Sequence, residues 1–338
     1  MRFFPRKARV LVSLENSCDD TCIFIYNGFP KKGIIISKKH TQFLNIFGGI
    51  FPKYSAKAHR IHLGNNVLRL MKPKQIALST GPGIAECLRE GLEVSRNLRV
   101  PIKAVHHVHA HLVSSISGNS PKFPFLGIVL SGGHTLISLC THPGKYIILG
   151  QTYDDSLGEC LEKILRGIFP NNLGNTFHED ILEMYNLGSN SIVFPKILKA
   201  ELPKSLNFSY CGLKTFMQNL KFDGDQKEIL VRSFLDFIFD DIIGKIKISI
   251  SLLKGTMFEP KSLVFGGGVC KNKILRRKIL IYANQEGLDV TIPKAKYSTD
   301  NAYMILKTAF FDRKYGLDYN KTLEIKTHWP INDIKADE

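Results

Sequence analysis

The amino-acid sequence predicts an α/β protein made of two successive units, and three observations favour this fold class. Apolar runs with the composition of strands alternate with segments of helical periodicity along most of the chain. Two predicted strands end in glycine-rich turns, FPFLGIVLSGG at 123–133 and KSLVFGGGV at 261–269. A third strand, VLVSLE at 10–15, runs into an acidic turn and is followed at once by a returning strand, CIFIY at 22–26. Any parallel sheet needs glycine turns, but two of this kind in one chain indicate a repeated ligand-facing loop.

The composition indicates a globular protein with a polyanionic partner. A length of 338 residues suits about two domains, and 44% hydrophobic with 22% charged residues is ordinary for a soluble chain. The charge balance is unusual, because 46 Lys and Arg against 30 Asp and Glu give a net charge of +16. Such an excess suits nucleic acid or an anionic membrane surface. No apolar run approaches the roughly 18 residues of a spanning helix, so we expect no membrane partner.

The cysteines and the first nine residues indicate the cellular compartment of the protein. The seven cysteines are scattered and show neither metal-finger spacing nor a disulfide framework, which predicts a reducing compartment. The opening MRFFPRKAR carries four basic residues and no acidic one, as a short matrix-targeting segment would. A frayed basic terminus has the same composition. We expect localisation in the mitochondrial matrix in preference to the cytoplasm.

The first unit begins with the strand, acidic turn and returning strand of 10–26. Actin-like and sugar-kinase-like folds use this arrangement to hold nucleotide phosphates, and an ordinary hairpin with Asp19 and Asp20 as turn residues is the alternative interpretation. A helix is predicted over 55–71, with a basic edge made of Lys53, Lys57, His59 and Arg60. A strand at 75–80, a helix over 84–98 and a short strand at 102–105 complete the unit.

The run HHVHAH at 106–111 is the candidate metal site of the first unit. On a helix, His107 and His111 are four residues apart on one face, the spacing that lets two imidazoles bind one ion. Four histidines in six residues make chance pairing easy, so a buried or solvated role is the alternative. No glutamate follows the first histidine as in HExxH, and a zinc peptidase would therefore lack its general base.

The second unit begins with the strand at 123–130. Its glycine turn is flanked by the hydroxyl groups of Ser131 and Thr135, which we expect to donate to an anion. The remaining expected elements are strands at 135–140 and 145–150, a helix over 153–168, a long amphipathic helix over 226–253 and a basic helix over 271–280. Asp154 and Asp155 lie near the start of the first of these helices.

We therefore predict a duplicated actin-like ATPase fold of the ribonuclease H-like kind, with two α/β domains around a nucleotide cleft. Other doubly wound folds share this periodicity. The predicted domains are 1–120 and 121–338, with the C-terminal helix from about residue 300 packing back on the first domain.

The motifs also resemble those of a known family over nearly the whole chain. The matching runs are LENSCDDT, GGIFPKYSAKAH, TGPG, VHHVHAH, FPFLGIVLSGGHT, YDDSLGE, FSYCGLKT, GGGVCKN and STDNAYMI. In this order and spacing they resemble the tRNA threonylcarbamoyladenosine transferases, formerly called O-sialoglycoprotein endopeptidases. The SCDDT turn is similar to the bacterial and mitochondrial branch, and the closing HWPINDI resembles the mitochondrial members.

The resemblance implies an actin-like ATPase fold and a metal-dependent acyl transfer. The threonylcarbamoyl group would pass from threonylcarbamoyl-AMP to the exocyclic amine of the adenosine beside the anticodon, in tRNAs that read ANN codons. It also implies that His107, His111 and Asp300 bind one divalent ion. Iron or zinc is expected first, with magnesium as the alternative.

The same resemblance implies the other site residues. The catalytic pair would be Glu15 and Asp19, and the nucleotide-binding residues would be Val129, Leu130, Ser131, Gly132, Gly133, Glu162, Gly174, Gly268 and Asn272. Two departures stand out. Glu162 replaces the family's aspartate, and PNNLGN at 170–175 replaces its PGGP turn, with Gly174 as the substitute for the missing backbone approach.

The expected partners are tRNA, the nucleotide adenylate and a second copy of the chain in a homodimer, while the need for helper subunits is left open. Three other functions stay in view. A small-molecule kinase or ATPase of the same fold would use the glycine turns but has no need for the HxxxH helix. A metallopeptidase would use the histidines but not the glycine turns. A non-catalytic tRNA-binding protein would explain only the charge.

Overall fold

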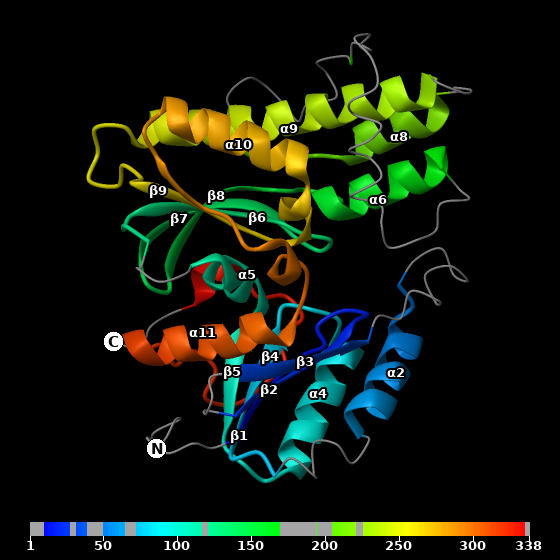
Figure 1. Ribbon diagram of the computed structural model, residues 1–338, viewed down its shortest axis with the longest axis vertical. Helices are drawn as coiled ribbons and strands as arrows, with labels where there is room; N and C mark the ends of the chain where they lie inside the picture. Colours follow the sequence, from blue (N-terminus) through cyan, green and yellow to red (C-terminus); the bar gives the residue numbers. More distant parts are fainter. Residues whose placement is uncertain are drawn as a thin grey trace. The chain divides into compact units, whose positions relative to one another are not determined.

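The protein folds into two compact α/β units, each with its own sheet and core (Figure 1). A computed structural model describes residues 10–27, 32–38, 50–64, 72–116, 121–169, 194, 205–220 and 226–334. Unit 1 comprises Met1–Ser114, Pro143–Tyr146 and Asp300–Glu338, and unit 2 comprises Ser115–His142 and Ile147–Thr299. The residues from Asp300 onward, which the predicted division counted with the second domain while expecting their helix to pack back on the first, belong to unit 1. The division near the middle of the chain falls after Ser114, before the predicted boundary at 120.

The sheet of unit 1 has five strands in the order β3-β2-β1-β4-β5. Their bounds are Val10–Glu15 for β1, Thr21–Asn27 for β2, Lys32–Lys38 for β3, Gln75–Gly81 for β4 and Ile102–His106 for β5. The strands β1, β2 and β3 pair antiparallel, whereas β4 pairs parallel with both β1 and β5. The strand β3 was not predicted from the sequence.

The sheet of unit 2 repeats this arrangement. Its strands are β6 (Phe125–Leu130), β7 (Thr135–His142), β8 (Lys145–Gln151), β9 (Ser262–Gly266) and β10 (Asp289–Thr291). The strand order is β10-β9-β6-β7-β8, which is β8-β7-β6-β9-β10 when read from the other edge. If the strands of each unit are numbered from one to five along the chain, both sheets have the order 3-2-1-4-5. Again the first two strands pair antiparallel and the fourth joins the first in parallel. The predicted duplication is therefore present in the topology.

Helices cover both faces of the unit 1 sheet. They are α2 (Pro52–Gly64), α4 (Ala85–Asn97), α5 (His107–Ser115) and α11 (Ala302–Tyr315). Residues of α2 and α4 pack on one face, and residues of α5 and α11 pack on the other (Figure 1). The buried side of α4 follows helical spacing, with Cys87, Leu88 and Leu92 among its buried residues. The predicted helix over 55–71 begins earlier, at Pro52, and its last part, 65–71, lies outside the described residues.

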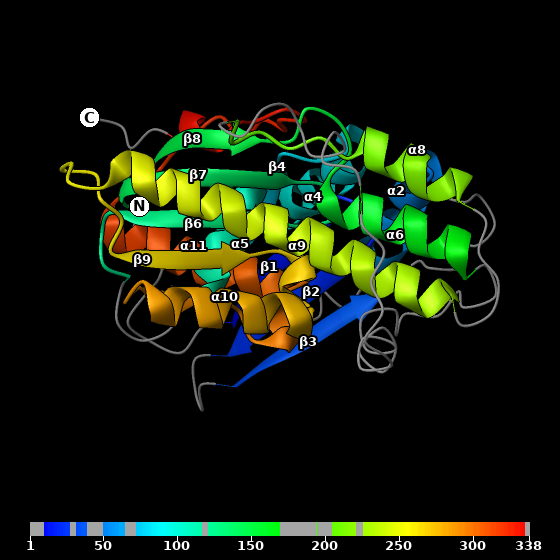
Figure 2. The ribbon, with the colours of Figure 1, turned by 90° about the horizontal axis from the view of Figure 1, so that it is seen from above.

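In the described part of unit 2, a large apolar core lies under four helices. They are α6 (Leu157–Ile168), α8 (Cys211–Asn219), α9 (Gln226–Leu253) and α10 (Lys273–Gln285). Phe234, Ile238 and Ile242 recur every four residues on α9 and are buried against the sheet, along which the helix runs (Figure 2). Short 3-10 helices occur at Gly268–Lys271, Ala295–Tyr297 and Ile331–Asp333. None of the helices in the described ranges combines the length and apolar character needed to cross a membrane.

The turn after β9 requires glycine. Gly267 has a φ of 100°, and a Cβ atom there would lie 2.3 Å from the carbonyl oxygen of Leu130 at the end of β6. The close approach follows from the parallel pairing of the two strands, in which Val129 lies opposite Gly266. Gly244, within α9, is the contrasting case, because a Cβ atom there would meet nothing within 4 Å.

We expect Gly267→Ala and Gly244→Ala to change stability in opposite directions. The first forces both a left-handed backbone on alanine and a clash with backbone, and should lower the free energy of unfolding by at least about 2 kcal/mol. The second removes a flexible residue from a helix and should raise it by about 0.5–1 kcal/mol. Urea unfolding of both variants measures the two values, and equal effects would contradict this account of the turn.

Candidate functional site

The predicted metal ligands converge in unit 1. The helix α5 starts directly after β5, so His107 and His111 lie on its first turns, and their ring centroids are 4.7 Å apart. Asp300 comes from the other end of the chain and precedes α11, where the side chain of Asn301 caps the helix by accepting from Met304 N at 2.9 Å. One ligand atom from each of His107, His111 and Asp300 lies within 4.8 Å of the other two.

The distances within this triad suit an ion better than a hydrogen-bonded cluster. Oδ1 of Asp300 lies 3.1 Å from Nε2 of His111 and 3.8 Å from Nε2 of His107. Both ring nitrogens of His111 are buried and neither makes a hydrogen bond, despite the short distance to Asp300. A buried imidazole left without partners is costly in the absence of a ligand. Two imidazoles and one carboxylate form a donor set that suits zinc or iron.

Glu15 positions His107. Its Oε2 lies 3.1 Å from Nδ1 of His107, while its Oε1 accepts from the backbone N–H of Ser17 at 2.8 Å. Since a carboxylate only accepts, Nδ1 carries the proton and Nε2 supplies the lone pair for an ion. Burial disfavours the imidazolium of His107, but the carboxylates of Glu15 and Asp300 outweigh it and raise its pKa to about 9. An incoming ion must therefore displace the Nε2 proton.

The acidic turn between β1 and β2 is held by His59. Its Nε2 donates to the carbonyl oxygen of Cys18 at 2.8 Å, and its Nδ1 accepts from the hydroxyl of Thr21 at 2.7 Å. His59 is fully buried, and burial lowers its pKa. Its assignment to the basic edge of α2 was therefore wrong, because the neutral ring faces the turn and not solvent. Asp19, the other predicted catalytic carboxylate, is partly exposed on this turn.

Unit 2 brings the two glycine turns together. Because β6 and β9 are adjacent and parallel, the loop Ser131–Gly133 and the loop Gly267–Gly268 leave the sheet at the same edge. Gly132 and Gly133 are exposed, and a Cβ atom on either would meet nothing within 4 Å, so their backbone faces open space. Val129 and Leu130 have fully buried side chains in β6, which leaves only their backbone for a ligand.

The start of α6 packs against the first of these loops. Gly158 N donates to Ser131 O at 3.1 Å, and a Cβ atom on Gly158 would lie 2.6 Å from that oxygen. Ser156 caps the helix by accepting from Glu159 N, a capping box in the sequence SLGE. The hydroxyl of Thr135 accepts from Leu157 N at 2.7 Å and is buried, so it holds α6 and does not face an anion as expected.

The remaining predicted nucleotide residues have mixed placements. The side-chain oxygen of Asn272 caps α10, accepting from Ile274 N at 2.9 Å and Leu275 N at 3.1 Å, which leaves its NH₂ group for other partners. The carboxylate of Glu162 is exposed on α6 and pairs with Arg166 one turn later. Its contact with a nucleotide stays a prediction. Gly174 and the rest of 170–175 lie outside the described residues.

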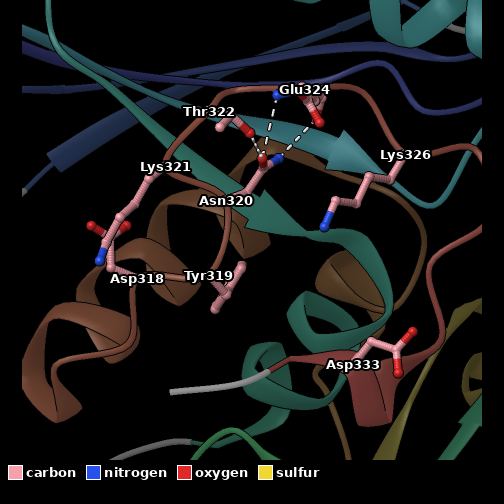
Figure 3. A pocket seen from close by; sticks show the side chains of 8 residues that line it. All are labelled: Asp318, Tyr319, Asn320, Lys321, Thr322, Glu324, Lys326 and Asp333. Carbon is pink, nitrogen blue, oxygen red and sulfur yellow. Dashed lines mark hydrogen bonds between the residues drawn. The ribbon is translucent and has the colours of Figure 1, made fainter. Parts of the chain in front are cut away.

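A separate hollow of about 290 Å³ lies in unit 1 on the segment after α11 (Figure 3). Its lining residues are Asp318, Tyr319, Asn320, Lys321, Thr322, Glu324, Lys326 and Asp333. Asn320 ties the segment together, since its Nδ2 donates to Glu324 O at 2.8 Å and its Oδ1 accepts from Thr322 (Figure 3). The lining mixes lysines with carboxylates and includes no residue of the metal triad.

Some residues that build the site had no role predicted from the sequence. Ser17 next to His107 and Gly158 against the first loop act through contacts with distant parts of the chain. Glu15 was predicted as a catalytic residue, but neither its contact with His107 nor the position of His59 under the acidic turn was predicted. The capping-box sequence SLGE could have predicted the start of α6, because Ser156 is the N-cap residue of this helix.

Repeated five-stranded sheets, a triad of two buried histidines and a partly exposed aspartate, and exposed glycine loops place the protein in the actin-like ATPase class with a candidate metal centre. The solved structure of T. kodakarensis HypF has this fold in common, with a TM-score of 0.50 and 13% identity over 92% of this chain and 48% of that chain. The likeness shows the fold alone.

The family is shown by sequence. The model of the tRNA N6-adenosine threonylcarbamoyltransferase family matches residues 33–307, and the chain belongs to this family. A tRNA N6-adenosine threonylcarbamoyltransferase of Buchnera aphidicola subsp. Baizongia pistaciae is 32% identical over 96% of this chain and 98% of that protein. The one of Wigglesworthia glossinidia brevipalpis is 31% identical over the same shares. The family resemblance and the fold class predicted from the motifs are thereby confirmed.

We expect His111→Ala to abolish metal binding and His109→Ala to leave a measurable site. The reason is that His111 has no other partner for its ring nitrogens, whereas His109 binds Tyr146 and Asp312. Metal content of the purified variants, measured by mass spectrometry, tests the assignment. Equal and complete loss of the ion in both variants would show that the triad is misassigned.

Proposed function

We propose that this chain transfers the threonylcarbamoyl group of threonylcarbamoyl-AMP to N6 of the adenosine beside the anticodon, in tRNAs that read ANN codons. The observation that carries the proposal is the family match over 33–307, because this range contains both the metal triad of unit 1 and the glycine loops of unit 2. The near-complete coverage of the two curated relatives supports it further.

The reaction needs positioning more than activation of a nucleophile. The N6 amine attacks the carbonyl carbon of the mixed anhydride, a C–N bond forms, the C–O bond to the phosphate breaks, AMP leaves and N6 loses one proton. Because the adenylate is a good leaving group, the main demands are alignment and stabilisation of the developing oxyanion and the departing phosphate. The exposed amides of Gly132 and Gly133 suit the phosphate.

The metal centre would hold one divalent ion through His107, His111 and Asp300. When bound, the ion would supply a Lewis acid for the anionic oxygens of the reaction. Iron or zinc fits the donor set best, and magnesium, which prefers oxygen ligands, fits less well. Within the chain, Glu15 keeps the proton of His107 on Nδ1, and Asp19 is the carboxylate of the predicted catalytic pair with exposed surface.

Two other functions make different demands. A small-molecule kinase of the same fold would use the glycine loops but would not depend on His107 for activity. A metallopeptidase would use the triad, yet the chain offers no glutamate at the position next to His107 that an HExxH base requires. The proposed transfer is the function that uses both sites.

The direct test is nucleoside analysis of unmodified tRNA incubated with the protein and chemically made threonylcarbamoyl-AMP. We expect threonylcarbamoyladenosine in tRNAs that read ANN codons, and a loss of at least about a hundredfold in the rate for His111→Ala, as for removal of a key electrostatic stabiliser. Asp318→Asn, which changes an exposed side chain outside the triad and the glycine loops, is the control and should keep the parent rate. No modified nucleoside with any tRNA, with metal and donor present, would reject the proposal.

We expect tRNA binding to weaken steeply with salt, by a log–log slope of about −0.7 to −0.9 for each phosphate contacted. Lys53, Lys57 and Arg277 are exposed and available for such contacts. Arg276 serves as the control, because its guanidinium binds the carbonyl oxygens of Cys270 and Pro293. Replacing Lys53 with alanine should reduce the slope by about one phosphate contact and replacing Arg276 should not; a flat salt response of the parent protein would remove tRNA as a partner.

Several finer features complete the proposal. The protein would act in the mitochondrial matrix, with iron as one candidate ion, and would form a homodimer, with the need for helper subunits open. The basic opening residues and the net charge of +16 support the compartment and the tRNA partner respectively. Glu162 and Gly174 remain proposed nucleotide contacts, the former competing with its ion pair to Arg166.

A further inference from the structure

The two histidines of HHVHAH outside the triad, His106 and His109, lie in a buried hydrogen-bond network of unit 1. Its other members are Tyr146, Asp312, Tyr319 and Trp329, of which the last three belong to α11 and the segment that follows it. All six side chains are buried, and His106, His109 and Asp312 are fully so. This network, here called the α5 anchor, joins the C-terminal segment to the helix that carries the metal ligands.

His106 caps α5. Its Nδ1 accepts from the backbone N–H of His109 at 3.2 Å, which satisfies one of the N–H groups left unpaired at the start of the helix. Because Nδ1 accepts, the proton lies on Nε2, and this group donates to the carbonyl oxygen of Trp329 at 2.9 Å. The C-terminal segment thus fixes the tautomer of the residue that starts the metal-binding helix.

Asp312 closes the network from the side of α11. The Oδ1 of Asp312 lies 3.1 Å from Nε2 of His109, and its Oδ2 accepts from the hydroxyl of Tyr319 at 2.5 Å. Since the carboxylate can only accept, His109 carries its proton on Nε2 and its Nδ1 accepts from Tyr146 at 2.7 Å. The Tyr319 oxygen in turn accepts from the backbone N–H of His106 at 3.3 Å. Each of these hydrogen bonds joins a donor to an acceptor.

We infer that the α5 anchor positions the metal ligands, with Asp312 and Tyr319 as positioning residues that act through His106 and His109. His109 lies midway between His107 and His111, so fixing its ring and the first turn of α5 fixes the rotation of the helix about its axis. The orientation of both ligand imidazoles depends on that rotation. This inference rests on the proposed metal centre and adds the C-terminal segment to it.

The network is more than ordinary core packing because its buried histidine, tyrosine and carboxylate groups hydrogen-bond to one another, whereas the indole N–H of Trp329, which joins only through its carbonyl oxygen, makes no hydrogen bond. A buried carboxylate with two donors is strongly directional, and a half-satisfied network is costlier than an apolar core. The histidine rings also contact aromatic rings here: the His106 ring centroid lies 4.6 Å from that of Trp329 in a tilted arrangement, and the His109 centroid lies 5.6 Å from that of Tyr146 edge to face. Trp329 is the single tryptophan of the chain and therefore reports on the anchor by fluorescence.

The test is competition for Zn²⁺ between the metal-free full-length protein and a chromophoric chelator. Tyr319→Phe removes the hydroxyl oxygen that donates to Asp312 and accepts from the His106 N–H. We expect this variant to bind Zn²⁺ about tenfold more weakly, because losing the hydrogen-bond partners of groups next to metal ligands typically lowers metal affinity by this amount. Asp312→Asn should do the same or more. Asp318→Asn is the matched control, because Asp318 is next to Tyr319 in the chain but its exposed carboxylate pairs with Lys103 and lies outside the network.

Two further readouts separate positioning from stability alone. The visible absorption spectrum of the Co²⁺-loaded protein should change in Tyr319→Phe, which a purely structural role would not cause once the variant is folded. His106→Asn should retain more Zn²⁺ affinity than His106→Ala, because asparagine is a good helix cap.

Unchanged Zn²⁺ affinity and an unchanged Co²⁺ spectrum in folded Tyr319→Phe would overturn the inference, even if its melting temperature falls. Absence of Zn²⁺ binding by the parent protein would overturn both the anchor and the metal centre. The transfer reaction itself is judged separately by the nucleoside analysis of tRNA, so a failure of the anchor leaves the proposed function standing.

Discussion

The packing of α11 against the sheet of unit 1 is the contact on which the candidate metal centre depends. Ala302, Met304 and Ile305 are fully buried among residues of β1, β2, β4 and β5, although they follow them by about two hundred residues or more in the chain. Full burial of one large apolar side chain contributes about 1.5–3 kcal/mol. This packing holds the start of α11, and with it Asp300, against the ligands on α5.

Hydrogen bonds add directional contacts to this apolar packing and so fix the position of α11 against β1 and α5. Ser13 of β1 donates to the carbonyl oxygen of Ala302 at 2.5 Å, and the amine of Lys307 donates to Ser114 O at the end of α5 at 2.7 Å. The Asn301 cap fixes the first turn of α11, directly after Asp300. Apolar burial alone tolerates small shifts, whereas hydrogen bonds between buried groups do not.

The two units share one strand topology but place different chemical groups at the ends of their strands. In both, the parallel pairing of the first and fourth strands brings two strand ends to one edge of the sheet. Unit 2 ends these strands in glycine loops with exposed backbone, which suits an anion. Unit 1 ends β1 in Glu15 and an acidic turn, which suits control of a cation. The duplication of the fold therefore does not duplicate the site.

Local patterns in the sequence were enough to predict the fold class, most of the strands and helices, the i, i+4 pair His107 and His111, and the glycine loops. These features depend on local periodicity, turn chemistry and motif order, all of which are carried by neighbouring residues. The family match of residues 33–307 agrees with what the motifs indicated.

Which polar side chains act together became clear only from the folded chain. It assigned both oxygens of Glu15 to partners within the protein, buried His59 away from the basic edge, engaged Thr135 with α6 and joined His109 to Asp312. Apart from the bond between Ser17 N and Glu15, each of these contacts joins residues well separated in the chain, and the packing of strands and helices selects the partners. Local sequence cannot encode a partner that only the folded chain brings within hydrogen-bonding distance.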